Sequence, residues 1–346
     1  MDFTDGIMEI NVNHILCTSW SELEQAALPE VVAFLREWYD GSPYIVAHTS
    51  GSTGIPKELK LLKCDMKASA KLTNDYFGID RTSVLLLCLS PDYIAGKMMI
   101  VRALCSGACL LTVSPSSHPL DKIEEKIDFA AMVPMQVQKI LENESGKSRL
   151  NRIKKLIIGG APVSQELESK LKNLSVTSYI TYGMTETVSH VALRQLNDGS
   201  NIYFALGDIS FSEDNRNCLV IHAPHLSQKV FVTNDVVSLC DRTHFIWRGR
   251  FDWVINSGGV KIFPESIEKK LASVIPVRFF VTGVDDVLLG QKVVLVLEGE
   301  MWDEKEEQKL RACMNNILGR YEQPREIKYM PVFRETASGK IIREIH

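Results

Sequence analysis

The sequence predicts an α/β protein with a large N-terminal domain, built from parallel sheets and a smaller antiparallel region, and a small α+β domain at the C-terminus. Up to about residue 160, short apolar runs alternate with stretches at helical spacing, which is typical of parallel βαβ units. After about residue 200, short β-prone runs follow one another with tight links, which indicates antiparallel pairing. From about residue 253, strands and helices form a third, compact pattern.

In the first region we expect a helix over 21–39, which ends at the breaker cluster 40–43. The further helices are expected at 65–77, 98–104, 120–127 and 136–143. The strands are expected at 44–47, 84–89, 109–113, 129–133, 156–158 and 176–180.

The antiparallel region is expected to contain strands at 218–221, 229–232, 236–239 and 244–247. Beyond it we expect helices at 264–273 and 303–318, and strands at 277–282, 292–298 and 326–330. The domains are therefore predicted to span 1–250 and 253–346, with a hinge near Asp252.

Composition excludes several classes of function. The chain has 346 residues, 45% of them hydrophobic, and a net charge of −4, which argues against a nucleic-acid surface. The eight cysteines form no C-x-x-C pair and no zinc spacing, and no apolar run reaches the length of a membrane span. Because the N-terminus also lacks a signal sequence, we expect a cytoplasmic protein with no membrane span. The oligomeric state stays open, with a homodimer as one option.

The most informative stretch is a Gly-, Ser- and Thr-rich loop that follows the strand at 44–47. Backbone N–H groups, hydroxyls and a lysine on one short loop suit a polyphosphate. The lysine follows the second glycine by three positions, so the loop is not a Walker A loop. The residues expected to hold phosphates are Thr49, Ser50, Gly51, Ser52, Thr53, Gly54 and Lys57.

This loop resembles the phosphate-binding signature of the adenylate-forming superfamily, which includes acyl-CoA synthetases and luciferases. A second motif, Tyr182-Gly183-Met184-Thr185-Glu186, ends a likely strand and is similar to the superfamily's adenine and magnesium motif. The resemblance implies that Tyr182 and Gly183 contact the base, that Thr185 contacts phosphate, and that Glu186 is a ligand of Mg²⁺. Gly160 and Ala161 are also expected at the nucleotide.

Two further motifs concern the ribose and the hinge. In Thr233-Asn234-Asp235, Asp235 is expected to accept the ribose hydroxyls. Asn234 stands where the superfamily usually has glycine, but asparagine tolerates positive φ better than most residues. The resemblance implies that Arg250 contacts the nucleotide and that Asp252 is the pivot.

The C-terminal domain carries two more signatures. Gly258, Gly259 and Lys261 are similar to the loop that faces the active site when the thioester forms, although the glycines also fit a plain hairpin turn. The segment 336–340 resembles the terminal signature, whose lysine, Lys340 here, reaches the reacting carboxylate and the α-phosphate. The resemblance implies that this domain is mobile.

Within the superfamily the chain looks most like the o-succinylbenzoate–CoA ligases of menaquinone biosynthesis. That implies ATP, Mg²⁺ and coenzyme A as reactants beside a small carboxylic acid. The acid's second carboxylate needs polar partners. The predicted acid-binding residues are Tyr93, Gly159, Gly160, Ser189, His190 and Arg194.

Three alternatives stay open or fail at this point. Another aryl or acyl adenylating ligase, with coenzyme A or a carrier protein as acceptor, would have the same signatures. A catalytically silent nucleotide-binding relative is disfavoured because Glu186, Asp235 and Lys340 are all retained. A kinase or ordinary ATPase fails on the spacing of the phosphate loop.

Overall fold

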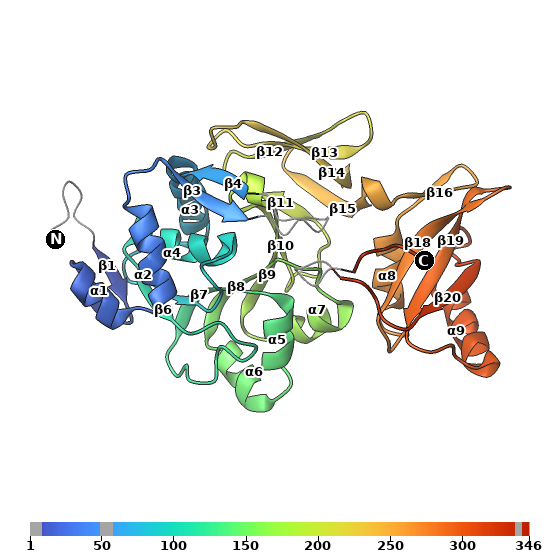
Figure 1. The fold of residues 1–346 in the computed structure, drawn as a ribbon, viewed down its shortest axis with the longest axis horizontal. Helices are drawn as coiled ribbons and strands as arrows, with labels where there is room; N and C mark the ends of the chain where they lie inside the picture. Colours follow the sequence, from blue (N-terminus) through green and yellow to red (C-terminus); the bar gives the residue numbers. More distant parts are fainter. Residues whose placement is uncertain (1–8, 49–57, 336–340, 346) are drawn as a thin grey trace.

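The computed structural model describes residues 9–48, 58–335 and 341–345. Most strands of the first region belong to one 13-stranded sheet with the order β12-β13-β14-β15-β11-β10-β9-β8-β7-β5-β6-β1-β2 (Figure 1). A separate two-stranded sheet, β3 (Tyr44–His48) with β4 (Glu58–Leu62), flanks the segment 49–57.

The parallel half of the large sheet runs from β1 to β9 through five parallel pairings. Its strands are β1 (Ile10–Val12), β5 (Val84–Leu87), β6 (Cys109–Thr112), β7 (Ile127–Met132), β8 (Ile153–Ile158) and β9 (Thr177–Gly183), with β2 (Ile15–Cys17) antiparallel at the edge. The antiparallel half comprises β10 (His190–Gln195), β11 (Tyr203–Ala205), β12 (Ser210–Glu213), β13 (Cys218–His222), β14 (Val230–Leu239) and β15 (His244–Arg250). The predicted antiparallel region is therefore continuous with the parallel sheet.

Helices cover both faces of the parallel half (Figure 1). Alternate residues of one strand enter two different cores: Leu85 and Leu87 lie in one, Leu86 and Cys88 in the other. This period of two follows from the strand pleat, and both faces are apolar because both are buried. The helices are α1 (Trp20–Ala26), α2 (Pro29–Trp38), α3 (Lys63–Phe77), α4 (Ile94–Ser106), α5 (Pro134–Ile140), α6 (Glu144–Leu150) and α7 (Gln165–Lys172).

Two predicted helices were wrong. The helix expected over 21–39 is two helices, because Pro29 cannot continue a preceding helix but suits the first turn of the next one. The helix expected over 120–127 is a turn that leads into β7. Its apolar spacing arises because Leu120 and Ile123 fill the core, while Ile127 pairs with Ile153 across the sheet.

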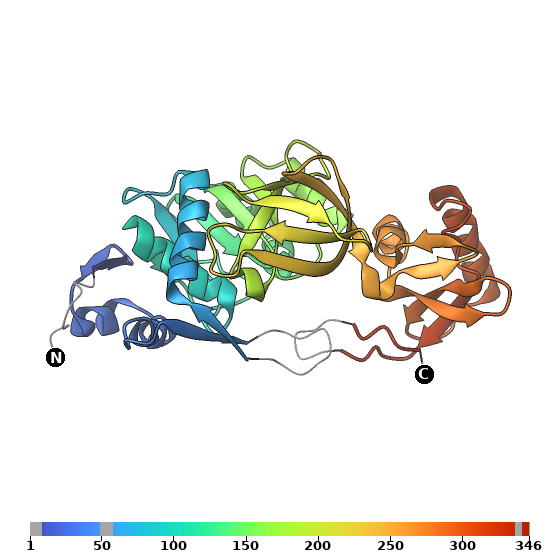
Figure 2. The same cartoon turned by 90° about the horizontal axis from the view of Figure 1, so that it is seen from above.

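Residues 255–335 and 341–345 form a second unit with its own sheet and its own core (Figure 2). The sheet contains β16 (Ile255–Ser257), β17 (Val260–Ile262), β18 (Phe279–Asp286), β19 (Gly290–Glu298) and β20 (Glu326–Met330), and the helices are α8 (Pro264–Leu271) and α9 (Glu304–Ile317). The only connection along the described chain between the two sheets is the short 3₁₀ helix η2 (Phe251–Trp253), which contains the predicted pivot Asp252.

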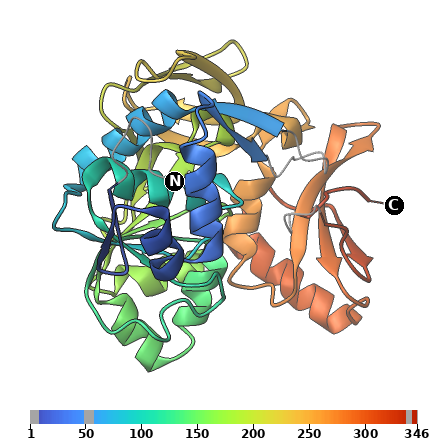
Figure 3. The same cartoon turned by 60° about the vertical axis from the view of Figure 1, so that its left-hand side comes forward.

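The two units are in contact in this structure (Figure 3). The Glu265 carboxylate of α8 accepts a 2.9 Å hydrogen bond from the backbone N–H of Arg250. The Lys269 ammonium of the same helix lies 3.8 Å from the Glu168 carboxylate of α7. These contacts join the C-terminal unit to the end of β15 and to α7.

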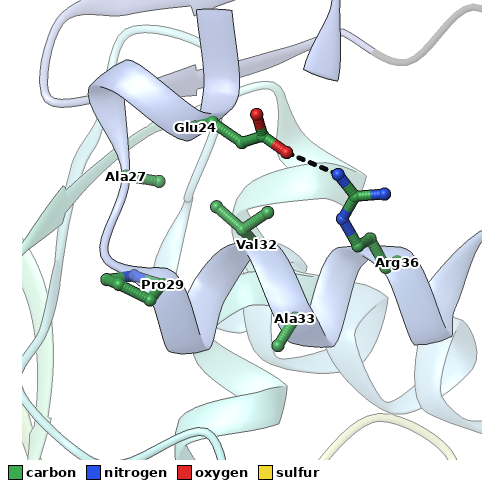
Figure 4. Close-up of a pocket in the computed structure, with 6 residues that line it drawn as sticks. All are labelled: Glu24, Ala27, Pro29, Val32, Ala33 and Arg36. Atoms are coloured by element: carbon green, nitrogen blue, oxygen red, sulfur yellow. Dashed lines mark hydrogen bonds and ion pairs between the residues drawn. The ribbon is translucent and has the colours of Figure 1, made fainter. Parts of the chain in front are cut away.

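A hollow of about 290 Å³ lies between α1 and α2, lined by Glu24, Ala27, Pro29, Val32, Ala33 and Arg36, none of which is a predicted site residue (Figure 4). Within the described ranges, no helix combines the length and apolarity needed to cross a membrane.

Candidate active site

Asp235 is the centre of a polar cluster that joins three strands. Its carboxylate accepts hydrogen bonds from the Tyr182 hydroxyl at 2.7 Å and from the Trp247 indole N–H at 3.1 Å. The Arg250 guanidinium lies 3.9 Å away and also bonds the Asp252 carboxylate at 2.9 Å. Each oxygen of Asp235 therefore has one protein donor and retains a lone pair for a further donor, such as a hydroxyl.

Tyr182 is the aromatic member of this cluster. Its ring packs edge-on against Tyr203 and Phe245, with centroid distances of 5.9 and 5.1 Å. Burial, with the neighbouring Asp235 charge, raises the pKa of its hydroxyl well above the usual value. The hydroxyl is therefore a fixed donor to Asp235 at neutral pH.

The segment Thr233–Asp235 does not separate two strands, as the predicted strands at 229–232 and 236–239 implied. It lies within β14, and Asn234 is not among the non-glycine residues with positive φ. Instead, the Asn234 amide donates to the Asp252 carboxylate at 3.2 Å and accepts from Arg216 at 2.9 Å. Asn234 thus links β14 to the connection between the two units.

Glu186 and Ser189 belong to the loop that connects the end of β9 to the start of β10. Gly183 is required there, because a Cβ would lie 2.4 Å from the Ser189 carbonyl oxygen. Thr185 and Glu186 belong to the 3₁₀ helix η1 (Thr185–Thr187), and Glu186 is exposed without an ion pair to any described residue. The described residues contain no cluster of three or more metal-binding side chains, and the exposed carboxylate of Glu186 is a donor of the kind that Mg²⁺ takes beside phosphates and water.

Beneath this loop lies a buried arginine that the sequence analysis missed. Arg102 of α4 is 2% exposed, and no acidic side chain of the described residues pairs with it. Its Nη2 donates to the Ser189 hydroxyl at 2.8 Å, its Nη1 reaches only the Met99 sulfur at 3.4 Å, and its Nε has no partner. Burial lowers its pKa to about 9, so at pH 7 a positive charge is held in the interior without a counter-charge from any residue in 9–48, 58–335 or 341–345.

The hydrogen bonds continue from Arg102 to His190. The Ser189 hydroxyl lies 3.3 Å from His190 Nδ1, and His190 Nε2 lies 3.3 Å from the Thr73 hydroxyl, which donates to the Ser69 carbonyl. Arginine can only donate, so Ser189 is left to donate to Nδ1, which places the ring proton on Nε2. Burial, together with the Arg102 charge, lowers the pKa of His190 well below its usual value, so the ring is neutral.

Arg194, predicted to hold the acid's second carboxylate, has a different partner. Its guanidinium donates to Glu168 at 2.6 and 3.3 Å, and the two side chains are only 6% and 9% exposed. Because its side chain is buried, Arg194 is not a surface residue. In this structure the charge of Arg194 is neutralised by Glu168, and the pair joins β10 to α7.

Gly159, Gly160 and Ala161 follow the end of β8, beside the end of β9. A Cβ on Gly159 would lie 2.2 Å from the Thr181 hydroxyl, so only glycine fits between the two strands. Gly160 has φ of +82°. Because β8 and β9 are parallel, their carboxyl ends meet at one edge of the sheet, where open α/β sheets bind ligands.

Comparison with known proteins now decides the family. The model of a family described as "AMP-binding enzyme" matches residues 16–205, more than half of the chain. The chain belongs to this family of AMP-binding enzymes. With the relatives below, the match makes it an AMP-forming acid–CoA ligase.

Curated relatives of this family member have consistent names. A "Probable 2-succinylbenzoate--CoA ligase" of Mycobacterium tuberculosis is 27% identical over 329 residues, which cover 89% of this chain and 84% of that protein. A "2-succinylbenzoate--CoA ligase" of Lactococcus lactis is 24% identical, with coverage of 99% and 78%.

Solved structures show the same fold. An acyl-CoA synthetase (AMP-forming)/AMP-acid ligase II-like protein from Dyadobacter fermentans is 36% identical, with a TM-score of 0.63 and coverage of 94% of this chain and 97% of that one. An o-succinylbenzoate coenzyme A synthetase from Bacillus subtilis, in complex with ATP and magnesium, has a TM-score of 0.71 at 19% identity and covers 86% of this chain and 68% of that one.

Several predicted family residues lie apart from this site or outside the described residues. The phosphate loop, Thr49 to Lys57, and Lys340 lie outside the described residues. Tyr93 precedes α4 with 63% of its surface exposed, so its ring lines no closed pocket in this structure. Gly258 and Gly259, with φ of +57° and +80°, form the two-residue turn between β16 and β17, and Lys261 follows it exposed on β17.

Sequence patterns could not reveal Arg102 as an isolated charge. It lies in the apolar run of α4, where a lone arginine suggests a helix end or a surface position. The signal that was available is the absence of an acidic residue at helical spacing from it, since none occurs between 93 and 106.

Proposed function

We propose that this chain converts o-succinylbenzoate to o-succinylbenzoyl-CoA, in two steps that use ATP, Mg²⁺ and coenzyme A. In the first step the aliphatic carboxylate attacks the α-phosphorus of ATP, and pyrophosphate leaves. In the second step the thiol of coenzyme A attacks the acyl carbon, AMP leaves, and the thiol proton is released. A dicarboxylic substrate of this kind is supported by one observation above all, the buried and unpaired Arg102.

An uncompensated interior charge is costly, so it calls for an anionic partner. Arg102 lies directly behind the half-buried Ser189 hydroxyl, at 2.8 Å. In this proposal the ring carboxylate of the substrate accepts a hydrogen bond from Ser189, with the Arg102 charge behind it. His190 is neutral, so it neither repels nor replaces that charge.

The remaining roles are assigned to the residues of the other motifs. Asp235 accepts the ribose hydroxyls, and Tyr182 and Gly183 contact the adenine. Arg250, Thr185, Gly160 and Ala161 lie around the phosphates and the acyl group. Mg²⁺ bound by Glu186 would reduce the phosphate charge that opposes attack by a carboxylate.

Lys340 would offset the charge that develops on the carboxylate and the α-phosphate. Movement of the C-terminal unit about Asp252 would then withdraw Lys340 and bring Gly258, Gly259 and Lys261 to the active site. These roles rest on the resemblance of the motifs, and Lys340→Ala tests the first of them through loss of adenylation with ATP binding retained.

The test is pyrophosphate release from Mg·ATP with a panel of acids, with and without coenzyme A. The panel contains o-succinylbenzoate, benzoate, a medium-chain fatty acid and 4-oxo-4-phenylbutanoate, which is o-succinylbenzoate without its ring carboxylate. We expect release with o-succinylbenzoate and a much lower kcat/KM, at least tenfold, with 4-oxo-4-phenylbutanoate, because a buried charge then stays unpaired.

Arg102→Met is expected to remove this preference, since both acids then meet a neutral site. Equal turnover of the two acids by the unaltered protein would refute the proposed substrate. Pyrophosphate release with another acid of the panel would support the ligase activity but show that the substrate is that acid. Release with none of them, despite ATP binding, would favour a silent relative.

A further inference from the structure

Val188 has a backbone conformation that valine rarely adopts. Its φ is +67° and its ψ −49°, and the N–H of Ser189 donates to the Thr187 carbonyl at 2.7 Å. This is a γ-turn of the rare and strained kind, centred on Val188. Positive φ is an outlier for a β-branched residue, because its Cβ substituents crowd the backbone.

The surrounding residues hold this conformation in place. The Val188 side chain is 2% exposed and belongs to the larger of the two cores of the N-terminal domain. On one side, the Thr187 hydroxyl accepts from the Met184 N–H at 3.0 Å and donates to the Ser189 carbonyl at 2.8 Å. As long as the Val188 side chain stays in the core, its backbone cannot leave this conformation without breaking the hydrogen bonds of the Thr187 hydroxyl.

The turn has a directional effect on the next residue. The chain reverses at Val188, so Ser189 follows a buried side chain and still presents its hydroxyl to Arg102 at 2.8 Å and to His190 at 3.3 Å. Residues in sparsely populated conformations persist only where their surroundings determine them, and they cluster at functional sites. Here the strained residue directly precedes the only hydroxyl bonded to the buried arginine among the described residues.

We propose that Val188 is a positioning residue: packing of its side chain in the core imposes the γ-turn that fixes the Ser189 hydroxyl on Arg102, and so sets the selectivity for an acid with a second carboxylate. Val188 itself touches no reacting atom. The part of this inference that concerns selectivity rests on the proposed function, whereas the part that concerns the turn does not.

The turn is tested by comparing alanine and glycine at two buried valines. Val191 is fully buried in β10 and has no positive φ, so it is the matched control. Glycine tolerates positive φ whereas alanine does not, so Val188→Gly should have a higher urea midpoint than Val188→Ala. At Val191 the order should be reversed, because glycine weakens a strand. If the alanine and glycine variants had the same order of urea midpoints at both positions, the inference of a strained turn at Val188 would be refuted.

The positioning role is tested with Val188→Gly, which can still form the turn but lacks the buried side chain that imposes it. We expect the KM for o-succinylbenzoate to rise about tenfold, as for loss of a charge-assisted hydrogen bond, with the KM for ATP and the turnover of 4-oxo-4-phenylbutanoate unchanged. An unchanged KM for o-succinylbenzoate, or equal losses with both acids, would overturn the role. Val191→Gly should leave both acids unaffected.

A readout without turnover separates this inference from the proposed function. Nitrogen NMR of the His190 ring, assigned with His190→Gln, reports whether Ser189 still bonds Nδ1. We expect the Nδ1 resonance to shift in Val188→Gly and to stay in place in Val191→Gly. If the protein turned over no acid of the panel, a shifted resonance would still support the positioning of Ser189, and an unshifted one would refute it.

Discussion

Replacement of Arg194 by methionine tests whether this residue acts through its pair with Glu168 or binds the acid. Arg194 and Glu168 are 6% and 9% exposed and are joined at 2.6 Å, so removal of the cation leaves a buried carboxylate. The second cation near Glu168 is Lys269, at 3.8 Å. Because 40% of its side chain is exposed, Lys269 neutralises the Glu168 charge only in part. We therefore expect Arg194→Met to lower the free energy of unfolding by about 3 kcal/mol, the lower end for a broken buried pair.

Urea denaturation with a double-mutant cycle measures this effect. Arg194→Met with Glu168→Leu leaves no buried charge, since Lys269 is 40% exposed, and should be more stable than Arg194→Met alone. The matched control is Lys71→Met, which breaks an exposed pair with Asp75 and should change stability by less than about 0.5 kcal/mol.

The assay also separates a structural role from substrate binding. In folded Arg194→Met, the KM for the acid should be unchanged, because in the original protein the Arg194 guanidinium is already bonded to Glu168. A loss of stability no larger than that of Lys71→Met, or a KM raised tenfold or more, would refute the reasoning and restore Arg194 as an acid-binding residue.

Three further predictions follow from single contacts. Gly183→Ala should abolish most of the activity, because the new Cβ would lie 2.4 Å from the Ser189 carbonyl; activity above half of the original would contradict this close approach. Asn234→Gly should speed hydrogen exchange of the backbone amides in 252–254 about fivefold, since the side chain that holds the Asp252 carboxylate at 3.2 Å is gone; unchanged exchange would show that this bond does not restrain the connection. Burial raises the pKa of Glu265 above 4.5, so the folded state binds its proton more tightly than the unfolded state does, and stability falls as pH rises from about 4.5 through the folded pKa. Unfolding measured against pH should therefore show Glu265→Gln gaining stability relative to the original protein over that interval, and a constant difference would contradict it.

The sequence by itself predicted the order of the elements and most of the motif positions. Strands and helices at 84–89, 109–113, 156–158 and throughout 264–330 were recognisable, because local periodicity reflects burial on one or two faces. The α/β class and the family resemblance follow from such local patterns. The errors at 21–39 and 120–127 arose where helical spacing was present but a proline or a pairing strand took precedence.

Tertiary structure decided which of the buried arginines has an acidic partner among the described residues. Arg194 and Arg102 are both single arginines in apolar surroundings, and the sequence favoured Arg194 because it lies close to the second motif. Only the packing of α7 on β10 supplies Glu168 to Arg194, and only the position of α4 beneath the loop places Arg102 at Ser189. Partners far apart in the sequence are brought together by sheet topology, and so the charge balance of the proposed acid-binding site is a property of the fold.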